Sequence, residues 1–451
     1  MKRIDPDSRS ASIPRKHPTR RQTCVLCYLR GNTYHPVCKS YYYYQASQVS
    51  STRHQAVKCS LPRIGRVTTT PFFSPRIVSR TPSGVHARRD MNASQEDLEE
   101  RPVRIGINGF GRIGRLVCRA ARNRGLTTVA INDPLLGASY ASFLLTHDTV
   151  MGRFEGEVST STERDDCFLI DGEPVHVTQR TDPGEVPWGA SGCDYVVEAS
   201  GKFLTTALCR EGHIKRGSAE RVIMTAPSKD ADTPMYVFGV NHESYALDQQ
   251  VVSCASCTTN ALAPLAKIID DNFGLSEGLM TTVHALTISQ PTVDSANPKD
   301  WRRGRSGMNN IIPTSSGAAS SLGRILPTLR GKLTGFALRV PVADVSLLDL
   351  TCVLERPTTI DEIKAAVKLA AEEEFEGLVR YTDDPVVSSD FIGDPSSLIF
   401  DSAAAVSTSP HLVKLLAWYD NEWGYSCRVV DMMMHMWEAD KMRQGLKNPV
   451  A

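Results

Sequence analysis

Cys257 lies where an apolar, strand-like segment gives way to a helix, within residues 253–260, Ser-Cys-Ala-Ser-Cys-Thr-Thr-Asn. The residues before it are β-like, and apolar residues recur at helical spacing after it. In the first turn of a helix, unpaired backbone N–H groups and the positive end of the dipole lower the pKa of a thiol. The pattern therefore predicts a nucleophilic thiolate, and the alternative is a small buried cysteine that only fills space.

His284 ends another apolar strand-like segment, Thr281-Thr282-Val283-His284-Ala285. If this strand runs back past the helix of Cys257, the imidazole can pair with the thiolate as imidazolium and exchange a proton with an adjacent oxygen. The alternative is a structural histidine. Together the two residues predict covalent catalysis by a thiol with a histidine base.

A glycine-rich turn, Gly109-Phe110-Gly111-Arg112-Ile113-Gly114, follows one predicted strand and opens a predicted helix. Two glycines let the turn tighten and the backbone approach a pyrophosphate, and the third lets the helix pack on the strand. Asp133 ends the next predicted strand, where its carboxylate can accept both ribose hydroxyls and repel a 2′-phosphate. These features predict a Rossmann dinucleotide site that prefers NAD, with NADP as the alternative.

Side chains suited to binding phosphate are spread through the half of the chain that follows Cys257. Hydroxyls, backbone N–H groups and guanidinium groups hold phosphate in proteins. Arg339 lies inside an apolar strand-like segment, so if buried it needs an anionic partner, either a ligand or a carboxylate of this chain. The other candidates are Ser256, Thr258, Thr287, Ser316 and Gly317.

The elements that must position these residues alternate before Cys257 and become β-rich after it. The predicted strands are 103–108, 127–133, 194–198, 221–225, 251–253, 280–287, 333–342 and 346–354, and the predicted helices are 112–124, 360–375 (with a capping box at its start) and 425–441. The first two strands and the helix between them form a βαβ unit. The predicted class is α/β, with a basic extension (1–101), a Rossmann NAD-binding domain (102–256), a mixed α+β catalytic domain (257–424) and a C-terminal helix (425–451).

Charge is divided sharply along the 451 residues, although the net charge is only +1. Residues 1–90 contain 17 Lys and Arg against 3 Asp and Glu, so the rest of the chain is mildly acidic. We interpret 1–101 as disordered and similar to an organellar transit peptide, with an ordinary tail or a true start at Met91 as alternatives. Its Cys and His residues match no standard zinc spacing, so no metal site is predicted; they are Cys24, Cys27, His35 and Cys38.

Composition narrows the class of protein further. The chain is 41% apolar and 22% charged, which is typical of a soluble globular protein. No apolar run approaches the length of a membrane span, and nothing in the acidic part indicates nucleic-acid binding. Twelve cysteines are too few for a disulfide scaffold in a chain this long, and no secretory signal opens it, which favours a reducing compartment.

Five segments together resemble phosphorylating glyceraldehyde-3-phosphate dehydrogenase. They are 106–115 (GINGFGRIGR), 255–260 (ASCTTN), 278–285 (GLMTTVHA), 331–335 (GKLTG) and 418–426 (WYDNEWGYS). The resemblance covers about 103–437 and does not reach the first hundred residues. It implies two domains per subunit, a C-terminal helix that packs back on the NAD domain, and a homotetramer.

The resemblance also implies a role for each candidate. Cys257 attacks the aldehyde of glyceraldehyde 3-phosphate, His284 activates the thiol and takes the hydroxyl proton as hydride passes to NAD, and inorganic phosphate cleaves the resulting thioester to 1,3-bisphosphoglycerate. Thr287 and Arg339 hold the phosphate of the substrate. The residues implied to receive or assist the incoming phosphate are Ser256, Thr258, Ser316, Gly317 and Arg302. The implied NAD contacts, besides the three glycines, are Arg112, Ile113, Asp133, Thr225 and Asn421.

Several positions depart from the family pattern. Ala261 stands where a second cysteine is common, and Cys254 stands where asparagine is usual, so we hypothesise that Cys254 is an alternative resolving thiol for Cys257. Ser316 replaces a threonine and keeps its hydroxyl. The segment 295–296 does not match the strictly NAD pattern, which leaves NADP as the alternative coenzyme.

Two other functions fit parts of the sequence. Oxidation of erythrose 4-phosphate uses the same fold and thiol chemistry. The dependence of the rate on inorganic phosphate distinguishes it from oxidation of glyceraldehyde 3-phosphate. The second is an interaction protein, in which the basic N-terminal segment binds a partner and the folded part has no catalytic role. The intact set of Cys257, His284 and Arg339 argues against it. The predicted location is the cytoplasm, with a plastid or other organelle as the alternative, and no membrane or nucleic-acid partner is predicted.

Overall fold

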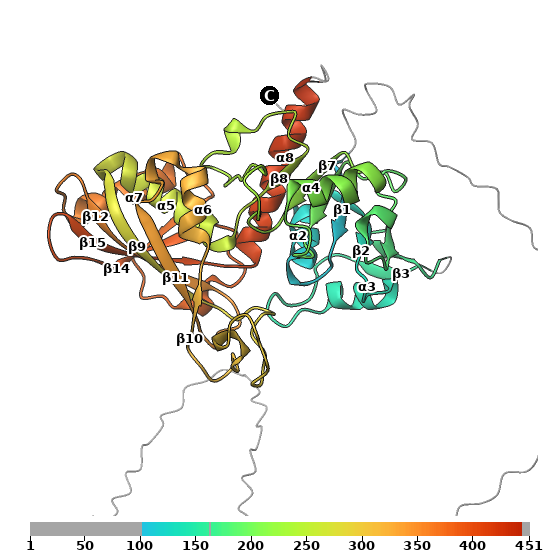
Figure 1. Cartoon of the computed structure of the whole chain (residues 1–451), viewed down its shortest axis with the longest axis horizontal. Helices are drawn as coiled ribbons and strands as arrows, with labels where there is room; N and C mark the ends of the chain where they lie inside the picture. Colours follow the sequence, from blue (N-terminus) through green and yellow to red (C-terminus); the bar gives the residue numbers. More distant parts are fainter. Residues whose placement is uncertain (1–101, 162–163, 444–451) are drawn as a thin grey trace, which may run out of the picture. The chain divides into compact units, whose positions relative to one another are not determined.

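The computed structural model describes residues 102–161 and 164–443, which form two sheets with helices packed on them (Figure 1). The extension 1–101, including the cysteines and histidine at 24–38, lies outside the described residues. The described part is an α/β protein, as the sequence predicts.

The first sheet has eight strands within the described residues. They are β1 (Arg104–Asn108), β2 (Thr127–Asn132), β3 (Val158–Thr160), β4 (Cys167–Ile170), β5 (Glu173–Thr178), β6 (Tyr195–Glu198), β7 (Arg221–Met224) and β8 (Val251–Ser253). The order is β3-β4-β5-β2-β1-β6-β7-β8, and the six strands from β5 to β8 are parallel. The direction of winding reverses between β1 and β6, and such a reversal opens a crevice for a dinucleotide at the carboxyl ends of the strands.

The helices before Cys257 that accompany the first sheet are α2 (Arg112–Asn123), α3 (Ala138–Thr146) and α4 (Thr206–Cys209), which continues as a π-helix (Arg210–Arg216). Helix α2 follows β1 through the predicted glycine turn. Its apolar side chains, among them Leu116 and Val117, are fully buried, as are Ile105 and Ile107 of β1. This packing fixes the N-terminus of α2 at the crevice.

The second sheet has seven strands within the described residues, in the order β10-β11-β9-β12-β15-β14-β13. They are β9 (Leu275–His284), β10 (Ile312–Ser315), β11 (Leu333–Arg339), β12 (Ser346–Leu354), β13 (Val379–Thr382), β14 (Leu398–Ser407) and β15 (Leu412–Tyr419). Helices α5 (Cys257–Phe273), α6 (Ala318–Ile325) and α7 (Ile360–Glu372) share an apolar core with this sheet. The predicted capping box is present, because Thr359 and Glu362 bond to each other's backbone N–H.

One strand of the site ends earlier than the sequence predicts. The sequence predicts a strand at 280–287, but β9 ends at His284. Ala285 donates instead to the Ser346 hydroxyl, and Leu286 donates to the Val342 carbonyl. Thr287 therefore lies in a loop rather than on the sheet.

The last helix, α8 (Trp423–Arg443), packs back on the first sheet, as implied (Figure 1). Met432, Met433 and Met436 are buried in the same core as β1 and α2. Near the end of the helix, Asp440 accepts from Arg221 Nε at 2.6 Å and from the Tyr195 hydroxyl at 2.7 Å. In the described ranges, no helix is long and apolar enough to span a bilayer.

Candidate active site

Helix α5 begins at Cys257, which places the thiol in the first turn as predicted. Ser256 is the N-cap, and its hydroxyl accepts from a backbone N–H at 3.1 Å. The preceding Ala255 has φ +54°, a left-handed conformation that is uncommon for a residue with a side chain. Asn260 donates to two carbonyls of this turn, at 2.8 and 2.9 Å, and the Tyr425 hydroxyl donates to the Ala255 carbonyl at 3.0 Å. These bonds hold the strained turn that presents Cys257.

His284 lies beside the thiol, with Nε2 3.5 Å from Cys257 Sγ. Its other nitrogen, Nδ1, is 2.8 Å from the Ala285 carbonyl oxygen, which can only accept a hydrogen bond. Arg339 Nη1, which can only donate, lies 2.6 Å from the same Nδ1, so the carbonyl and the guanidinium favour opposite tautomers. With its proton on Nδ1, toward the carbonyl, the imidazole turns the lone pair of Nε2 to the sulfur and can accept a proton from the thiol.

Burial controls the protonation of this pair. It raises the pKa of the Cys257 thiol, against the opposing effects of Arg339 and of N–H groups in the first turn of α5. It also lowers the pKa of His284 to about 3, with Arg339 as the second cause. Burial thus favours a neutral thiol and a neutral imidazole, against the helix terminus, which favours the predicted thiolate. The thiolate and imidazolium stay a prediction.

Arg339 is positioned by strand register. Strands β9 and β11 are parallel neighbours, and Arg339 is the register partner of His284. Its Nη1 is 2.6 Å from His284 Nδ1 and 3.3 Å from the Ala285 carbonyl oxygen. Its Nε is buried without a hydrogen bond, and no carboxylate of the described residues pairs with it. Of the two predicted partners for this cation, an anionic ligand fits better than a salt bridge.

A second arginine near this site is Arg303, which directly follows the predicted Arg302. The charge of Arg303 lowers the pKa of Arg339, and Arg303 Nε is buried without a hydrogen bond. Arg302 is exposed on a short 3-10 helix (Arg302–Gly304), and its backbone N–H donates to Asp300 Oδ1 at 3.1 Å. The sequence contains both arginines side by side, and only the fold distinguishes them.

The predicted hydroxyl ligands differ in their burial and in the hydrogen bonds that they already make. Thr287 is half-buried, with its hydroxyl 2.9 Å from both the Ser289 hydroxyl and Gln290 Oε1. Ser316 precedes the N-cap of α6, Gly317, and its hydroxyl accepts from the backbone at 3.3 Å. Thr258, by contrast, is buried, and its hydroxyl bonds to the Tyr419 hydroxyl at 2.9 Å. Ser289, which no motif in the sequence singles out, follows Thr287 by two residues and adds a hydroxyl to the same loop.

The glycine turn has the shape that a pyrophosphate requires. A Cβ on Gly109, whose φ is +93°, would lie 2.6 Å from the backbone of Ser200, and one on Gly114 would lie 2.1 Å from the Gly109 carbonyl oxygen. A Cβ on Gly111 would meet nothing within 4 Å. Gly111 is the N-cap of α2, so this open space lies at the positive end of the helix.

The other predicted coenzyme residues line the same crevice or support it. Asp133 accepts from the backbone N–H of Phe110 and of Leu135, each at 3.0 Å, which ties the end of β2 to the glycine turn. Thr225 donates to the Glu198 carbonyl through its hydroxyl at 3.1 Å. The Arg112 side chain bridges Asp148 and Glu422, so it joins α2 to the start of α8. Ile113, beside it, packs half-buried against the core of the first sheet.

Comparison with known proteins agrees with this geometry. The model of the glyceraldehyde 3-phosphate dehydrogenase NAD binding domain matches residues 103–206, and that of the C-terminal domain matches 256–421. A glyceraldehyde-3-phosphate dehydrogenase of Mucor circinelloides is 52% identical over 339 residues, which are 75% of this chain and 98% of the relative. The chain belongs to the glyceraldehyde-3-phosphate dehydrogenase family.

Other members of the family show similar coverage. One from Saccharomyces cerevisiae is 52% identical over 75% of this chain and 100% of its own length. The chloroplastic one of Arabidopsis thaliana is 51% identical over 74% of this chain and 78% of its own length. The protein is thus an oxidoreductase that acts on an aldehyde group and uses NAD, and its match to the family models begins at residue 103.

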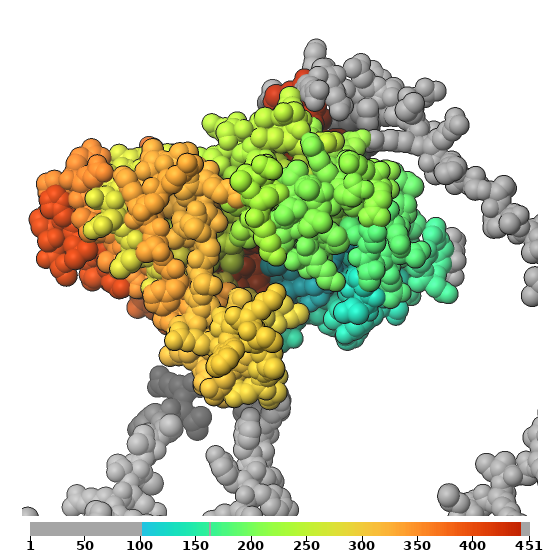
Figure 2. Space-filling view, viewed as in Figure 1, coloured from blue at the N-terminus to red at the C-terminus, as the bar shows by residue number. Residues whose placement is uncertain are grey.

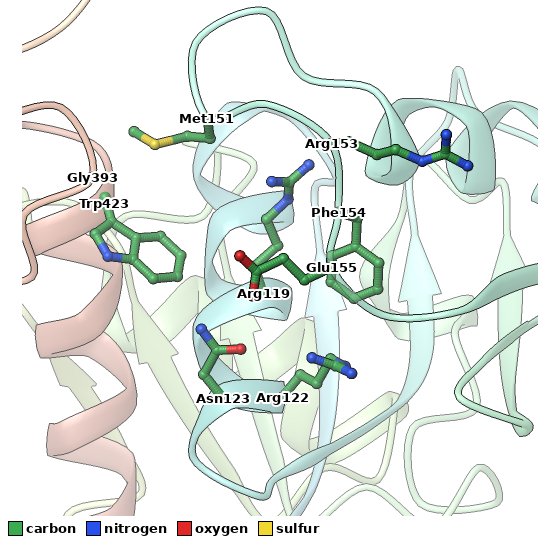
Figure 3. Close-up of a pocket in the computed structure, with 9 residues that line it drawn as sticks. All are labelled: Arg119, Arg122, Asn123, Met151, Arg153, Phe154, Glu155, Gly393 and Trp423. Carbon is green, nitrogen blue, oxygen red and sulfur yellow. The ribbon is translucent and has the colours of Figure 1, made fainter. Parts of the chain in front are cut away.

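A separate pocket of about 230 Å³ lies away from Cys257, between α2 and the start of α8. Figure 3 shows Trp423 and Met151 on one side of it and Arg119 on the other. Arg119 donates to two backbone carbonyls, at 2.8 and 3.1 Å, and Arg122 pairs with Asp171. These arginines already have partners, so we assign the chemistry to the site at Cys257.

Cys254, the hypothetical resolving thiol, is 2% exposed, and burial raises its pKa to about 12. It is therefore a poor source of thiolate, and its redox role stays a prediction. Across 102–161 and 164–443, no three His, Cys, Asp or Glu side chains are grouped so that they can hold a metal ion.

Proposed function

We propose that this protein catalyses the NAD-dependent oxidative phosphorylation of D-glyceraldehyde 3-phosphate to 1,3-bisphosphoglycerate. The observation that carries the proposal is the contact of Cys257 Sγ with His284 Nε2 at 3.5 Å, next to the cation of Arg339. This arrangement places a nucleophile, a base and an anion-binding group within one small region. Aldehyde oxidation by a thiol needs the first two, and a phosphorylated substrate needs the third.

The chemistry follows from the neutral pair. Cys257 attacks the aldehyde carbon while His284 Nε2 takes the thiol proton, and the aldehyde oxygen becomes the hydroxyl of a hemithioacetal. His284 then returns to its neutral form and takes the proton of that hydroxyl as the carbon is oxidised to a thioester. Bound NAD supplies the acceptor for the hydride. Inorganic phosphate attacks the thioester carbon, which releases Cys257 and forms the acyl phosphate.

Two phosphate positions are proposed around the reacting carbon. Arg339 and Thr287 hold the phosphate of the substrate, with Ser289 beside them. The incoming phosphate is received by the N-terminal turn of α6, where Ser316 and Gly317 lie, and by Ser256 and the backbone of Thr258. We assign the assisting arginine to Arg303 in place of Arg302, because it is close to Arg339.

The coenzyme is held along the crevice of the first sheet. The pyrophosphate lies on the turn formed by Gly109, Gly111 and Gly114, with the backbone of Arg112 and Ile113. Asp133 binds the ribose of the adenosine. Thr225 and Asn421 contact the coenzyme nearer to the site of reaction.

The test is the rate of NADH formation by purified protein with glyceraldehyde 3-phosphate, NAD and varied inorganic phosphate. We expect the steady-state rate to rise with phosphate and saturate. An equal rate without phosphate, together with faster oxidation of erythrose 4-phosphate, would favour the alternative activity and contradict this proposal. Replacing NAD by NADP at equal concentration tests the coenzyme assignment.

We also propose that the enzyme is a homotetramer. Large apolar side chains are exposed on the segment 286–311, which forms the gold lobe in the lower part of Figure 2. Trp301 is 84% exposed, Val293 is 72% exposed, and Ile288 is fully exposed. Several large apolar side chains exposed on one segment favour a protein interface there. Analytical ultracentrifugation tests the proposal, and a sedimenting monomer contradicts it.

The proposed location is the cytoplasm, and a plastid is the alternative. The family match leaves residues 1–101 outside, and their basic composition is typical of an organellar address. N-terminal sequencing of the native protein decides whether the mature chain starts near residues 91–102. Imaging of a tagged full-length chain then separates import from a late start.

A further inference from the structure

A continuous chain of buried side-chain hydrogen bonds crosses the carboxyl ends of the neighbouring strands β5, β2, β1 and β6. Asn132 ends β2, Asn108 ends β1 and Glu198 ends β6, and each is at most 3% exposed. Asn132 Oδ1 accepts from the hydroxyl of Thr178, the last residue of β5, at 2.8 Å, and Asn132 Nδ2 donates to Asn108 Oδ1 at 2.8 Å. Asn108 Nδ2 donates to Glu198 Oε2 at 2.6 Å. We call these four residues the polar belt.

The hydrogen bonds of the polar belt run in one direction. Asn132 Oδ1 also accepts from the backbone N–H of Arg180 at 2.9 Å, so this oxygen has two donors and the amide nitrogen faces Asn108. Asn108 then presents its own oxygen to Asn132 and its nitrogen to Glu198. Each amide therefore donates towards Glu198, whose carboxylate can only accept.

Glu198 accepts from four donors in all. Its Oε2 accepts from Asn108 and from His213 Nε2, at 2.9 Å. Its Oε1 accepts from the backbone N–H of Ser200 at 2.8 Å and from the Ser200 hydroxyl. A carboxylate as deeply buried as this one needs such bonds to replace its hydration. His213 is fully buried and belongs to the π-helix Arg210–Arg216, and π-helical turns are frequent at functional sites.

The partners of Glu198 lie on both sides of the coenzyme crevice. Asn108 directly precedes Gly109 of the glycine turn, and a Cβ on Gly109 would lie 2.6 Å from the Ser200 backbone. The turn after β1 and the segment after β6 are therefore in contact where the winding of the sheet reverses. The Glu198 carbonyl also accepts from the backbone N–H of Thr225 at 3.0 Å and from its hydroxyl at 3.1 Å. One residue thus joins three segments of the crevice.

We propose that Glu198 is a positioning residue for the coenzyme, which fixes the glycine turn against Ser200 so that the pyrophosphate fits between β1 and β6. The proposal rests on the coenzyme contacts proposed above. Glu198 is 1% exposed and both of its oxygens are occupied, so it acts through Asn108 and Ser200 rather than by touching the coenzyme. Without the carboxylate, donors face donors at the contact of the two walls, and the walls move apart.

Calorimetric titration of Glu198→Gln with NAD and with adenosine, which lacks the pyrophosphate, tests the proposal. In either orientation, the new amide nitrogen faces the donors of Asn108 or those of Ser200. We expect the Kd for NAD to rise at least about tenfold. The Kd for adenosine should stay within about twofold of wild type, because its ribose binds at Asp133. Glu173→Gln, which removes an exposed carboxylate at the start of β5, is the matched control and should leave both constants unchanged.

A charge exchange within the polar belt keeps the test independent of folding losses. Asn108→Asp alone places two buried carboxylates side by side, and it should lower Tm and weaken NAD. When Asn108→Asp and Glu198→Gln are combined, the new carboxylate accepts from Asn132 and from the new amide, whose second hydrogen goes to His213. We expect the double variant to bind NAD within about threefold of wild type, although each single variant binds it at least about tenfold more weakly.

Three results would overturn the proposal: an unchanged Kd for NAD in Glu198→Gln, equal weakening of NAD and adenosine, or a double variant that binds NAD no more tightly than Glu198→Gln alone. The titrations need no turnover. A failure to oxidise glyceraldehyde 3-phosphate would therefore contradict the proposed function, while the binding pattern still decides the role of Glu198.

Discussion

Burial of a neutral His284 should make the protein sensitive to acid in a measurable way. The pKa of His284 falls from an ordinary value of 6.5 to about 3, first because it is buried and second because Arg339 lies beside it. Above pH 6.5 the residue is neutral in both the folded and unfolded states. As the pH falls below 6.5, the unfolded state binds a proton and the folded state does not. Stability is therefore present above pH 6.5 and is lost as the pH falls towards 3.

The size of the effect follows from the shift. At 1.36 kcal/mol per pH unit, His284 removes roughly 2 kcal/mol of unfolding free energy between pH 6.5 and 5, and about 5 kcal/mol by pH 3. His284→Gln cannot titrate, so it lacks this loss. The measurement is urea unfolding of both proteins at fixed concentration from pH 7.5 to 5. We expect the stability of wild type relative to His284→Gln to fall by about 2 kcal/mol across that range.

Arg339→Leu gives an internal check, because Arg339 is the second cause of the shift. In that variant we expect nearly the same loss down to pH 5 and a smaller one as the pH falls further towards 3, with the larger part, due to burial, retained. If instead wild type and His284→Gln differ by a constant amount from pH 7.5 to 5, His284 gains its proton in the folded state. The imidazolium predicted from sequence would then be right, and the neutral pair would be wrong.

Three further predictions address the nucleophile and the coenzyme. Cys257→Ser should lower kcat by at least about a thousandfold in the NADH assay, and retained activity would refute the thiol mechanism. Gly114→Ala should lower Tm and distort the glycine turn, because its Cβ would lie 2.1 Å from the Gly109 carbonyl oxygen. Gly111→Ala should leave Tm nearly unchanged, because its Cβ meets nothing within 4 Å, and should raise the Kd for NAD in calorimetric titrations. Asp133→Asn should raise kcat/KM for NADP relative to NAD by about tenfold, since it removes a charge that repels the 2′-phosphate; an unchanged ratio would place coenzyme choice elsewhere.

Local patterns were sufficient for much of the first domain. The glycine turn with its flanking strand and helix, β8, and the start of α5 at Cys257 follow from apolar periodicity and turn chemistry over short windows. Strands β3 to β5 and β13 to β15 escaped prediction. Strands β3, β4 and β13 have only three or four residues, which is too short for a periodic pattern, whereas the residues of β15 do alternate in burial and offered a local signal.

The sequence by itself determined the family, the coenzyme fold and the identity of the nucleophile, because these depend on residue types at fixed short spacings. Only the tertiary structure decided how those residues act. The register of β9 against β11 sets Arg339 beside His284, although 55 positions separate them. Burial then reverses the pKa shifts that the helix terminus alone predicts. Solvent exclusion and register are collective properties of packed strands, so no single segment of the chain contains them.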